Sequence, residues 1–319
     1  MKYNKPGIFS KFRSSKRNRI FGQFFNGRDL TAENIERYNI LSHRADYPFP
    51  HLDGNNTGYT KYIILGTERT GSSYLVELLK SHPSVISFSE LFVDDCSSFN
   101  YLGYPHHADI KLIKYRNDHP VEFLENLVYK PYKKDIGAVG FKLFYSQAHN
   151  NKLETVWKYL NGLDDLKIIH IQRRNTFHSF VSSKIALKEG ASKYPDWVIK
   201  EIQQLNMGIF PQQLDNDEKT FINIDYQECI NYFEKVKTEK AYYGEYFINH
   251  SVLDLYYEDL LVNIDRECEK LCGFLHLSNI PLKTFTEKQI KVPIKEIVKN
   301  YNELKNSFSG SEWYLFFDE

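Results

Sequence analysis

The stretch YIILGTERTGSSYL, residues 62 to 75, decides the fold of this 319-residue chain. It opens with a short apolar run typical of a buried strand and leads into the apolar spacing of one helix face, which continues to Leu79 before Pro83 stops the helix. A strand that passes through a glycine-containing loop into a helix directs backbone N–H groups and the positive end of the helix dipole at an anion. The stretch therefore predicts a phosphate-binding site.

The loop departs from the Walker A pattern in a way that bears on its ligand. Gly66 and Gly71 keep the G-x-x-x-x-G spacing, but Ser72 and Ser73 stand where a nucleoside-triphosphate loop has Lys and then Ser or Thr. The cation comes earlier, at Arg69. The loop is built for phosphate but is not obviously a site for ATP and magnesium.

The composition bounds the class of protein. Forty-one basic and forty-one acidic residues cancel, so no global field points to nucleic acid and any anion site is local. No apolar run approaches a membrane span, and the first residues lack the apolar stretch of a signal peptide. The four cysteines have neither C-x-x-C spacing nor the density of a disulfide scaffold. These features predict a cytoplasmic protein.

Strand-like and helix-like segments alternate from residue 61 onward, which predicts an α/β fold with a mainly parallel central sheet and helices on both faces. The expected strands are residues 62–65, 137–144, 166–172 and 251–256, and the clearest later helices are 176–187 and 264–275. We expect residues 61–319 to form a single α/β domain and residues 1–60 a basic N-terminal extension.

The extension is basic and aromatic over its first 28 residues, which contain no acidic residue. One interpretation is a basic amphipathic helix that makes a peripheral contact with an anionic membrane. The other is a solvated arm, or a strap whose phenylalanines pack on the domain.

A second motif follows the strand that ends at Gln172. Arg173 and Arg174 come at the carboxyl edge of the sheet, where open α/β folds bind their ligands. Ser182 lies eight residues after Arg174, so its hydroxyl can share a helix face with the start of that helix. A guanidinium and a hydroxyl that converge there suit a terminal phosphate. No aspartate of the Walker B kind ends this strand, which removes the usual second support for magnesium.

The two motifs together resemble those of the sulfotransferases that use 3′-phosphoadenosine 5′-phosphosulfate (PAPS). Residues 69 to 73, RTGSS, match the family loop that holds the 5′-phosphosulfate, and Arg174 with Ser182 match its 3′-phosphate motif. The resemblance covers residues 61 to 277 and is nearer to the glycan, glycolipid and protein-tyrosine enzymes than to the cytosolic steroid and phenol enzymes. It extends to HPSV at residues 82–85 and to YEDL at residues 257–260.

The resemblance implies a P-loop-like three-layer fold and a set of site residues. The residues expected to bind the donor are Arg69, Thr70, Gly71, Ser72, Ser73, Tyr74, Arg174, Ser182 and Lys288. The expected catalytic residues are Glu90, Arg69 and Lys142. Glu90 takes the proton from the acceptor hydroxyl, and Lys142 lies beside the transferred group. Arg69 stabilises the leaving oxygen without a metal.

Some assignments stay open at this point. His170 or His178 could be the base instead of the glutamate, since the cytosolic branch of the family uses a histidine. His106, His107 and Asp109 invite a metal interpretation, but two adjacent histidines do not easily face one ion. We expect no metal requirement.

The leading functional hypothesis is a PAPS-dependent sulfotransferase that acts on a hydroxyl of a glycan or glycolipid. One alternative is a magnesium-dependent small-molecule kinase on a variant P-loop, against which Ser72 in the lysine position argues. The other is a non-catalytic protein that keeps the nucleotide fold as an interaction module. Acceptor recognition is expected to fall to residues 93–135 and 190–250, where the sequence offers no motif.

Overall fold

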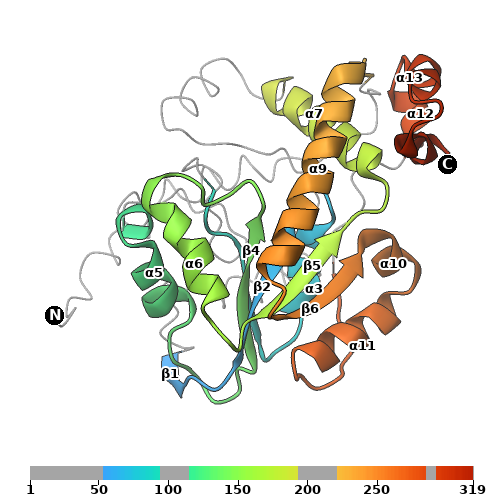
Figure 1. Cartoon of the computed structure of the whole chain (residues 1–319). Coiled ribbons are helices and arrows are strands. Elements are labelled where there is room, and N and C mark those ends of the chain that lie inside the picture. The colour runs from blue at the N-terminus through green and yellow to red at the C-terminus, as the bar shows by residue number, and fades with distance from the viewer. Residues whose placement is uncertain (1–52, 94–114, 193–220, 285–291, 319) are drawn as a thin grey trace, which may run out of the picture. The chain divides into compact units, whose positions relative to one another are not determined.

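A computed structural model of the chain describes residues 53–93, 115–192, 221–284 and 292–318, all within one compact unit that spans residues 52–319 (Figure 1). Most of the expected N-terminal extension, residues 94–114 and the expected donor-binding residue Lys288 lie outside the described residues. The domain boundary at residue 61, the membrane contact and the cytoplasmic location therefore stay predictions. Within the described residues, no helix is long and apolar enough to cross a membrane.

The centre of the fold is a five-stranded sheet with the strand order β3-β4-β2-β5-β6. Every neighbouring pair in it is parallel. The strands are β2 (Thr60–Gly66), β3 (Val85–Glu90), β4 (Ala138–Phe144), β5 (Lys167–Gln172) and β6 (Ser251–Tyr256). A shorter strand, β1 (Asp53–Asn56), forms antiparallel bridges to Tyr132 outside this sheet. The predicted fold class, an α/β fold around a mainly parallel sheet, is confirmed.

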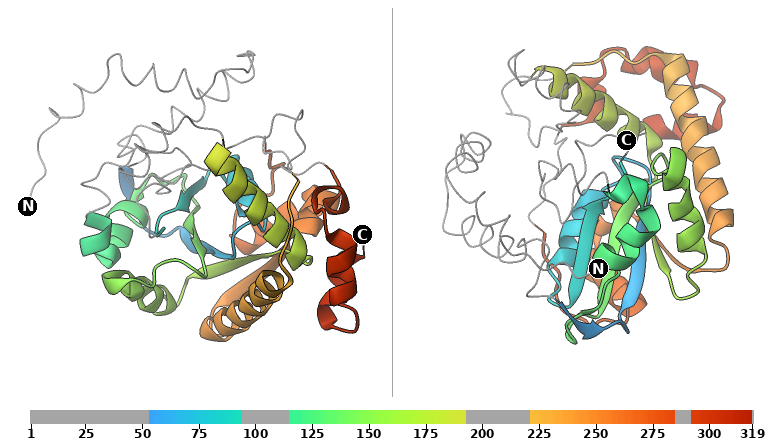
Figure 2. Two further views of the ribbon diagram at one scale, coloured as in Figure 1. Left: turned by 90° about the horizontal axis from the view of Figure 1, so that it is seen from above. Right: turned by 90° about the vertical axis from the view of Figure 1, so that its left-hand side faces the viewer.

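Helices cover both faces of the sheet, as Figures 1 and 2 show. On one face lie α3 (Ser72–Lys80), α10 (Tyr257–Val262) and α11 (Ile264–Phe274). They share a buried core with β2, β5 and β6 that includes Ile64, Leu78, Ile169 and Leu271. On the other face lie α6 (Thr155–Asn161) and α9 (Tyr226–Tyr246), whose aromatic side chains meet at the pair Trp157 and Tyr243.

A second core joins α7 (Thr176–Ser192) and α9 to the C-terminal helices, beside which they stand in Figure 1. Its aromatic residues include Phe177 and Phe233. The C-terminal elements are α12 (Ile294–Ile297), α13 (Tyr301–Ser307) and the 3₁₀ helix η5 (Glu312–Phe317). The remaining helical segments are α5 (Pro120–Phe123), the π-helical turn η3 (Leu124–Val128) and the 3₁₀ turn η4 (Asn151–Glu154).

The tyrosine-rich segment before residue 250 contains one long helix. Residues 226–246 are one helix, α9, and the Asp225 side chain accepts a hydrogen bond from the backbone N–H of Glu228 at its start. Tyr243 stacks on Tyr145 with ring centroids 4.9 Å apart. Packing of tyrosine rings such as that of Tyr243 therefore accounts for part of the tyrosine enrichment in this segment.

Candidate active site

The phosphate loop connects β2 to α3 and requires glycine at its last position. Gly71 has a φ of 83°, and a Cβ atom there would lie 2.2 Å from Cδ2 of the Tyr257 ring. Both the left-handed backbone and the aromatic ring therefore exclude a larger residue. Thr70 is buried, and its hydroxyl donates a 2.8 Å hydrogen bond to the carbonyl oxygen of Thr67, which folds the loop on itself.

The start of α3 is left open to an anion. No side chain caps this helix, and its first turn has no acidic residue. The N–H groups of a first helical turn have no partner within the helix, so they can donate to an anion. Ser72 is buried and Ser73 is exposed, while the Tyr74 ring meets the Tyr257 ring edge-on at 6.5 Å.

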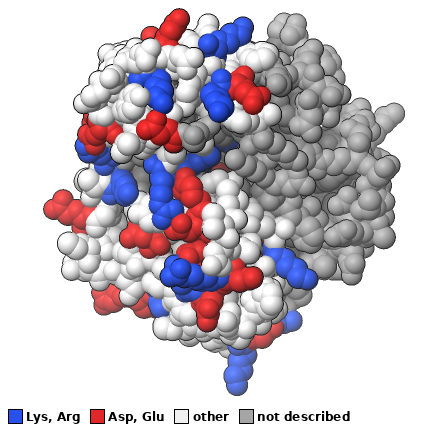
Figure 3. All heavy atoms as spheres, turned by 90° about the vertical axis from the view of Figure 1, so that its right-hand side faces the viewer, with Lys and Arg blue, Asp and Glu red and all other residues white. Residues whose placement is uncertain are grey.

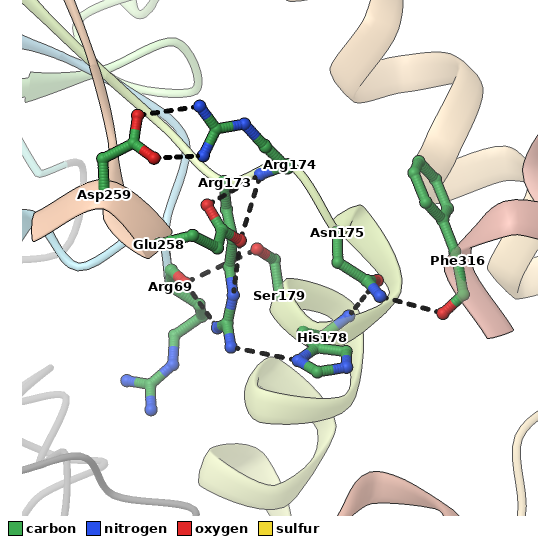
Figure 4. Close-up of polar contacts among 9 residues, drawn as sticks. All are labelled: Arg69, Arg173, Arg174, Asn175, His178, Ser179, Glu258, Asp259 and Phe316. Carbon is green, nitrogen blue, oxygen red and sulfur yellow. Dashed lines mark hydrogen bonds and ion pairs between the residues drawn. The ribbon is translucent and has the colours of Figure 1, made fainter. Parts of the chain in front are cut away.

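Arg69 connects the phosphate loop to α7. Its Nε donates a 2.9 Å hydrogen bond to the hydroxyl of Ser182, a residue that the sequence places in the second motif. Its backbone carbonyl accepts a 3.2 Å hydrogen bond from Nη1 of Arg173 (Figure 4). The structure therefore brings together Arg69 and Ser182, two of the residues expected to bind the donor.

The sequence predicts that Arg174 and Ser182 converge on one phosphate, but in the structure Arg174 has a different partner. Its guanidinium makes two 2.7 Å hydrogen bonds to the carboxylate of Asp259 and lies 4.2 Å from the centroid of the Tyr256 ring. Figure 4 shows the reason: the neighbouring side chains of Arg173 and Arg174 point to opposite sides, Arg173 toward the phosphate loop and Arg174 toward α10. In this structure the ion pair with Asp259 holds Arg174.

Arg173 is the arginine that reaches the loop, and the sequence motifs did not assign it a role. Its side chain is largely buried, and this burial lowers the pKa of its guanidinium. Its Nε lies 4.0 Å from a carboxylate oxygen of Glu258, and its Nη2 lies 3.4 Å from Nδ1 of His178. Glu258 also accepts the backbone N–H of Arg174. The doubled arginine and the acidic pair in YEDL were the sequence signals for this cluster.

A second cluster forms where β3 and β4 run side by side. Nζ of Lys142 lies 2.8 Å from Oε1 of Glu90 and donates a 3.2 Å hydrogen bond to the hydroxyl of Ser73. The two strands place Glu90 opposite Lys142 in register. Glu90 is the last residue of β3, which explains how it reaches the edge of the sheet. The lysine is 2% exposed, so the ammonium is held inside the protein beside the phosphate loop.

The histidines named as alternative bases differ in their surroundings. His170 is buried, with Nδ1 2.9 Å from Asp254 and Nε2 hydrogen-bonded to the hydroxyl of Tyr145. The hydrogen bond with His170 lowers the pKa of Asp254. Both ring nitrogens of His170 are thus engaged with other side chains. His178 lies beside Arg173 at the start of α7 and stays open as an alternative base.

The start of α7 is fixed by Asn175. Its Oδ1 accepts a 3.2 Å hydrogen bond from the backbone N–H of His178, and its Nδ2 donates to the carbonyl oxygen of Phe316 in η5 (Figure 4). The C-terminal segment, which the sequence motifs did not explain, therefore braces the element that carries Ser182 and His178.

The charges around these clusters are mixed. On the face drawn in Figure 3, basic and acidic side chains are interspersed, so attraction of an anion depends on local geometry. Among the described residues, no group of three or more His, Cys, Asp or Glu side chains could hold a metal ion. The expected metal candidates His106, His107 and Asp109 lie outside the described residues.

Comparison with known proteins finds a similar sequence and a similar solved structure. No protein-family model matches the chain. Nodulation protein H from Rhizobium tropici, a sulfotransferase, is 24% identical to it over 262 residues, which cover 81% of this chain and 92% of that protein. The chain is thus similar to a sulfotransferase over most of its length. The chain also matches the crystal structure of a sulfotransferase from Alicyclobacillus acidocaldarius, with 12% identity, a TM-score of 0.42, and coverage of 78% of this chain and 90% of that one.

Proposed function

We propose that this protein is a sulfotransferase that transfers a sulfuryl group from PAPS to a hydroxyl of a glycan or glycolipid acceptor. The observation that carries the proposal is the convergence of Glu90, Lys142 and Ser73 at the start of α3. A carboxylate, an ammonium and a hydroxyl beside an uncapped helix start can serve both the proton and the charge that move during sulfuryl transfer.

The phosphate loop fits the 5′-phosphosulfate of such a donor. The first N–H groups of α3 and the guanidinium of Arg69 offer donors and positive charge to the phosphate. Lys142, which donates a hydrogen bond to the hydroxyl of Ser73, provides a second cation. The donor supplies an electrophilic SO₃ group, which passes through a loose transition state by analogy with phosphoryl transfer, so positioning and charge stabilisation are the main demands on the protein.

The reaction needs one proton acceptor and one stabilised leaving group. As the acceptor oxygen forms its bond to sulfur, its proton passes to the carboxylate of Glu90. The bond between sulfur and the phosphate oxygen breaks, and that oxygen gains negative charge. The guanidinium of Arg69 and the ammonium of Lys142 stabilise this negative charge.

The acceptor class rests on the relationship to Nodulation protein H, which supports a sugar-type acceptor. The decisive test incubates the purified protein with ³⁵S-labelled PAPS and a panel of oligosaccharides, glycolipids and tyrosine peptides. We expect label in a saccharide-containing product. Label only in the peptides would overturn the acceptor assignment, and no label in any product would count against the transferase proposal.

Binding of the donor product separates the sulfotransferase from a kinase. Calorimetry should show tighter binding of 3′-phosphoadenosine 5′-phosphate (PAP) than of Mg-ATP, because the loop has serine in the Walker lysine position. The opposite order of affinities would favour the kinase.

Arg174 is proposed to hold the 3′-phosphate, which would have to compete with Asp259 for the guanidinium. We expect Arg174→Ala to weaken PAP binding by about tenfold to a hundredfold, because charge-assisted hydrogen bonds to a phosphate are lost. AMP, which lacks the 3′-phosphate, should lose less than about twofold in affinity. Calorimetric titration of both ligands into both proteins measures the difference.

Two further variants test whether Asp259 competes with the 3′-phosphate for the guanidinium of Arg174. Asp259→Asn removes the carboxylate that pairs with Arg174, so it should tighten PAP binding while leaving AMP binding nearly unchanged. Arg266→Ala, which removes one positive charge from the exposed side of α11, is the matched control for Arg174→Ala. Equal losses for PAP and AMP in Arg174→Ala would show that Arg174 serves only its ion pair with Asp259.

A further inference from the structure

A glutamine that no motif singled out lies against the carboxylate of Glu90. Gln147 follows β4 in a turn and is 5% exposed. Its side-chain Nε2 donates a 2.9 Å hydrogen bond to Oε2 of Glu90. Since Lys142 contacts Oε1, the two oxygens of this carboxylate are held from two sides by different residues.

The orientation of the Gln147 amide is determined by the backbone. Its Oε1 accepts a 3.1 Å hydrogen bond from the backbone N–H of Phe144. A backbone N–H can only donate, so the oxygen of the amide must face Phe144 and the NH₂ group must face Glu90. A flipped amide would place two donors against each other and its oxygen against a carboxylate, which is unfavourable at both ends.

The backbone of Gln147 is itself anchored. Its N–H donates to the carbonyl oxygen of Phe144 at 3.0 Å, and its carbonyl oxygen accepts a 3.1 Å hydrogen bond from the indole of Trp157 on α6. The side chain is therefore a rigid bridge from the end of β4 to the end of β3, with little freedom to follow a moving carboxylate.

We propose that Gln147 is the positioning residue that aims the carboxylate of Glu90 at the acceptor hydroxyl. This inference rests on the proposed function, in which Glu90 takes the proton. One hydrogen bond on each oxygen leaves a further lone pair on each, so the carboxylate stays able to accept a proton while its direction is fixed. Its hydrogen bonds within the described part of the chain go to Glu90, Phe144 and Trp157 and not to the phosphate loop or Arg174, so its effect should fall on the transfer step and not on donor binding.

Gln147→Glu is the sharpest test, because it changes only the group that faces Glu90. A glutamate can still accept from the N–H of Phe144, so the turn keeps its hydrogen bond. The donor toward Glu90 becomes a second carboxylate, and two carboxylates that share a site retain a proton to higher pH. We expect kcat at neutral pH to fall by about tenfold to a hundredfold and the acid limb of its pH profile to move up by about one pH unit.

The control is Gln227→Glu, the same substitution on the exposed side of α9. It should leave kcat, its pH profile and the KM for PAPS unchanged. For Gln147→Glu, the KM for PAPS should change by less than about threefold. A kcat within about twofold of the control and an unmoved acid limb would overturn the positioning role, because a residue that only supports the turn would not shift the profile.

A second measurement needs no catalysis. A double-mutant cycle of Gln147→Met and Glu90→Ala, read by denaturant unfolding, should show coupling of at least about fivefold in the unfolding equilibrium constant. Absence of coupling would overturn the inference whatever the reaction. If the coupling is present but the wild-type protein transfers no sulfate from PAPS, the contact stands, and both the proposed function and the positioning role of Gln147 fail.

Discussion

We expect Glu90→Gln to lower kcat for sulfate transfer by about a hundredfold to ten-thousandfold, because an amide cannot accept the proton of the acceptor hydroxyl. PAP binding should change by less than about threefold, because the loop and both arginines are intact. Single-turnover transfer from labelled PAPS and calorimetry with PAP measure the two effects. The control is Glu125→Gln, an exposed glutamate in η3.

The effect of Glu90→Gln on the stability of the protein must be separated from its effect on the transfer reaction. Glu90→Gln leaves the buried ammonium of Lys142 without its carboxylate, which should cost about 1 to 3 kcal/mol of unfolding free energy. Adding Lys142→Met removes the uncompensated charge, so the double variant should recover much of the stability and none of the activity. Activity within about tenfold of wild type in Glu90→Gln would move the base elsewhere, with His178 the next candidate.

Gly71→Ala is expected to destabilise the protein by about 2 to 4 kcal/mol and to abolish detectable PAP binding. The left-handed backbone at this position costs an L-residue about 1 to 2 kcal/mol. The new methyl group also meets the Tyr257 ring at 2.2 Å, so either the ring or the loop has to move. Denaturant unfolding and calorimetry with PAP measure the two losses.

Alanine substitutions at other glycines separate the cost of the left-handed backbone from the cost of the clash with the Tyr257 ring. Gly310 has a φ of 78°, and a Cβ atom there would have nothing within 4 Å, so Gly310→Ala reports the backbone cost alone. Gly244 lies within α9 and also has nothing within 4 Å, so Gly244→Ala should be neutral or stabilising by about 0.5 to 1 kcal/mol. The clash predicts that Gly71→Ala costs more than Gly310→Ala, and that Tyr257→Ala removes the excess. Equal costs would contradict a steric role for Tyr257.

Local patterns were sufficient for most of the fold. The apolar runs at residues 62–65 and 166–172 became β2 and β5, because a short apolar segment between turn residues can bury both faces only inside a covered sheet. The helices after both strands likewise followed from their spacing, although α7 continues to Ser192 beyond its expected end. Cys268 and Cys272, which lie four residues apart, are both buried in α11 and act as small core residues.

The candidate site was only partly predictable. The resemblance placed Glu90, Lys142 and Ser73 in one reaction, and the structure brings their side chains together. It separates Arg174 from Ser182 and gives each a different partner. A motif records which residue types recur at a spacing, whereas the direction of a side chain depends on the charges and rings that pack around it.

The sequence by itself determined the strand, loop and helix that present N–H groups to an anion, because these depend on residues that are neighbours along the chain. Only the tertiary structure decided which side chains serve that loop. Gln147 meets Glu90 across 57 positions, Arg174 meets Asp259 across 85, and the ring of Tyr257 closes on Gly71 from α10. Contacts of this kind arise when parallel strands bring their carboxyl ends to one edge, and no local pattern encodes them.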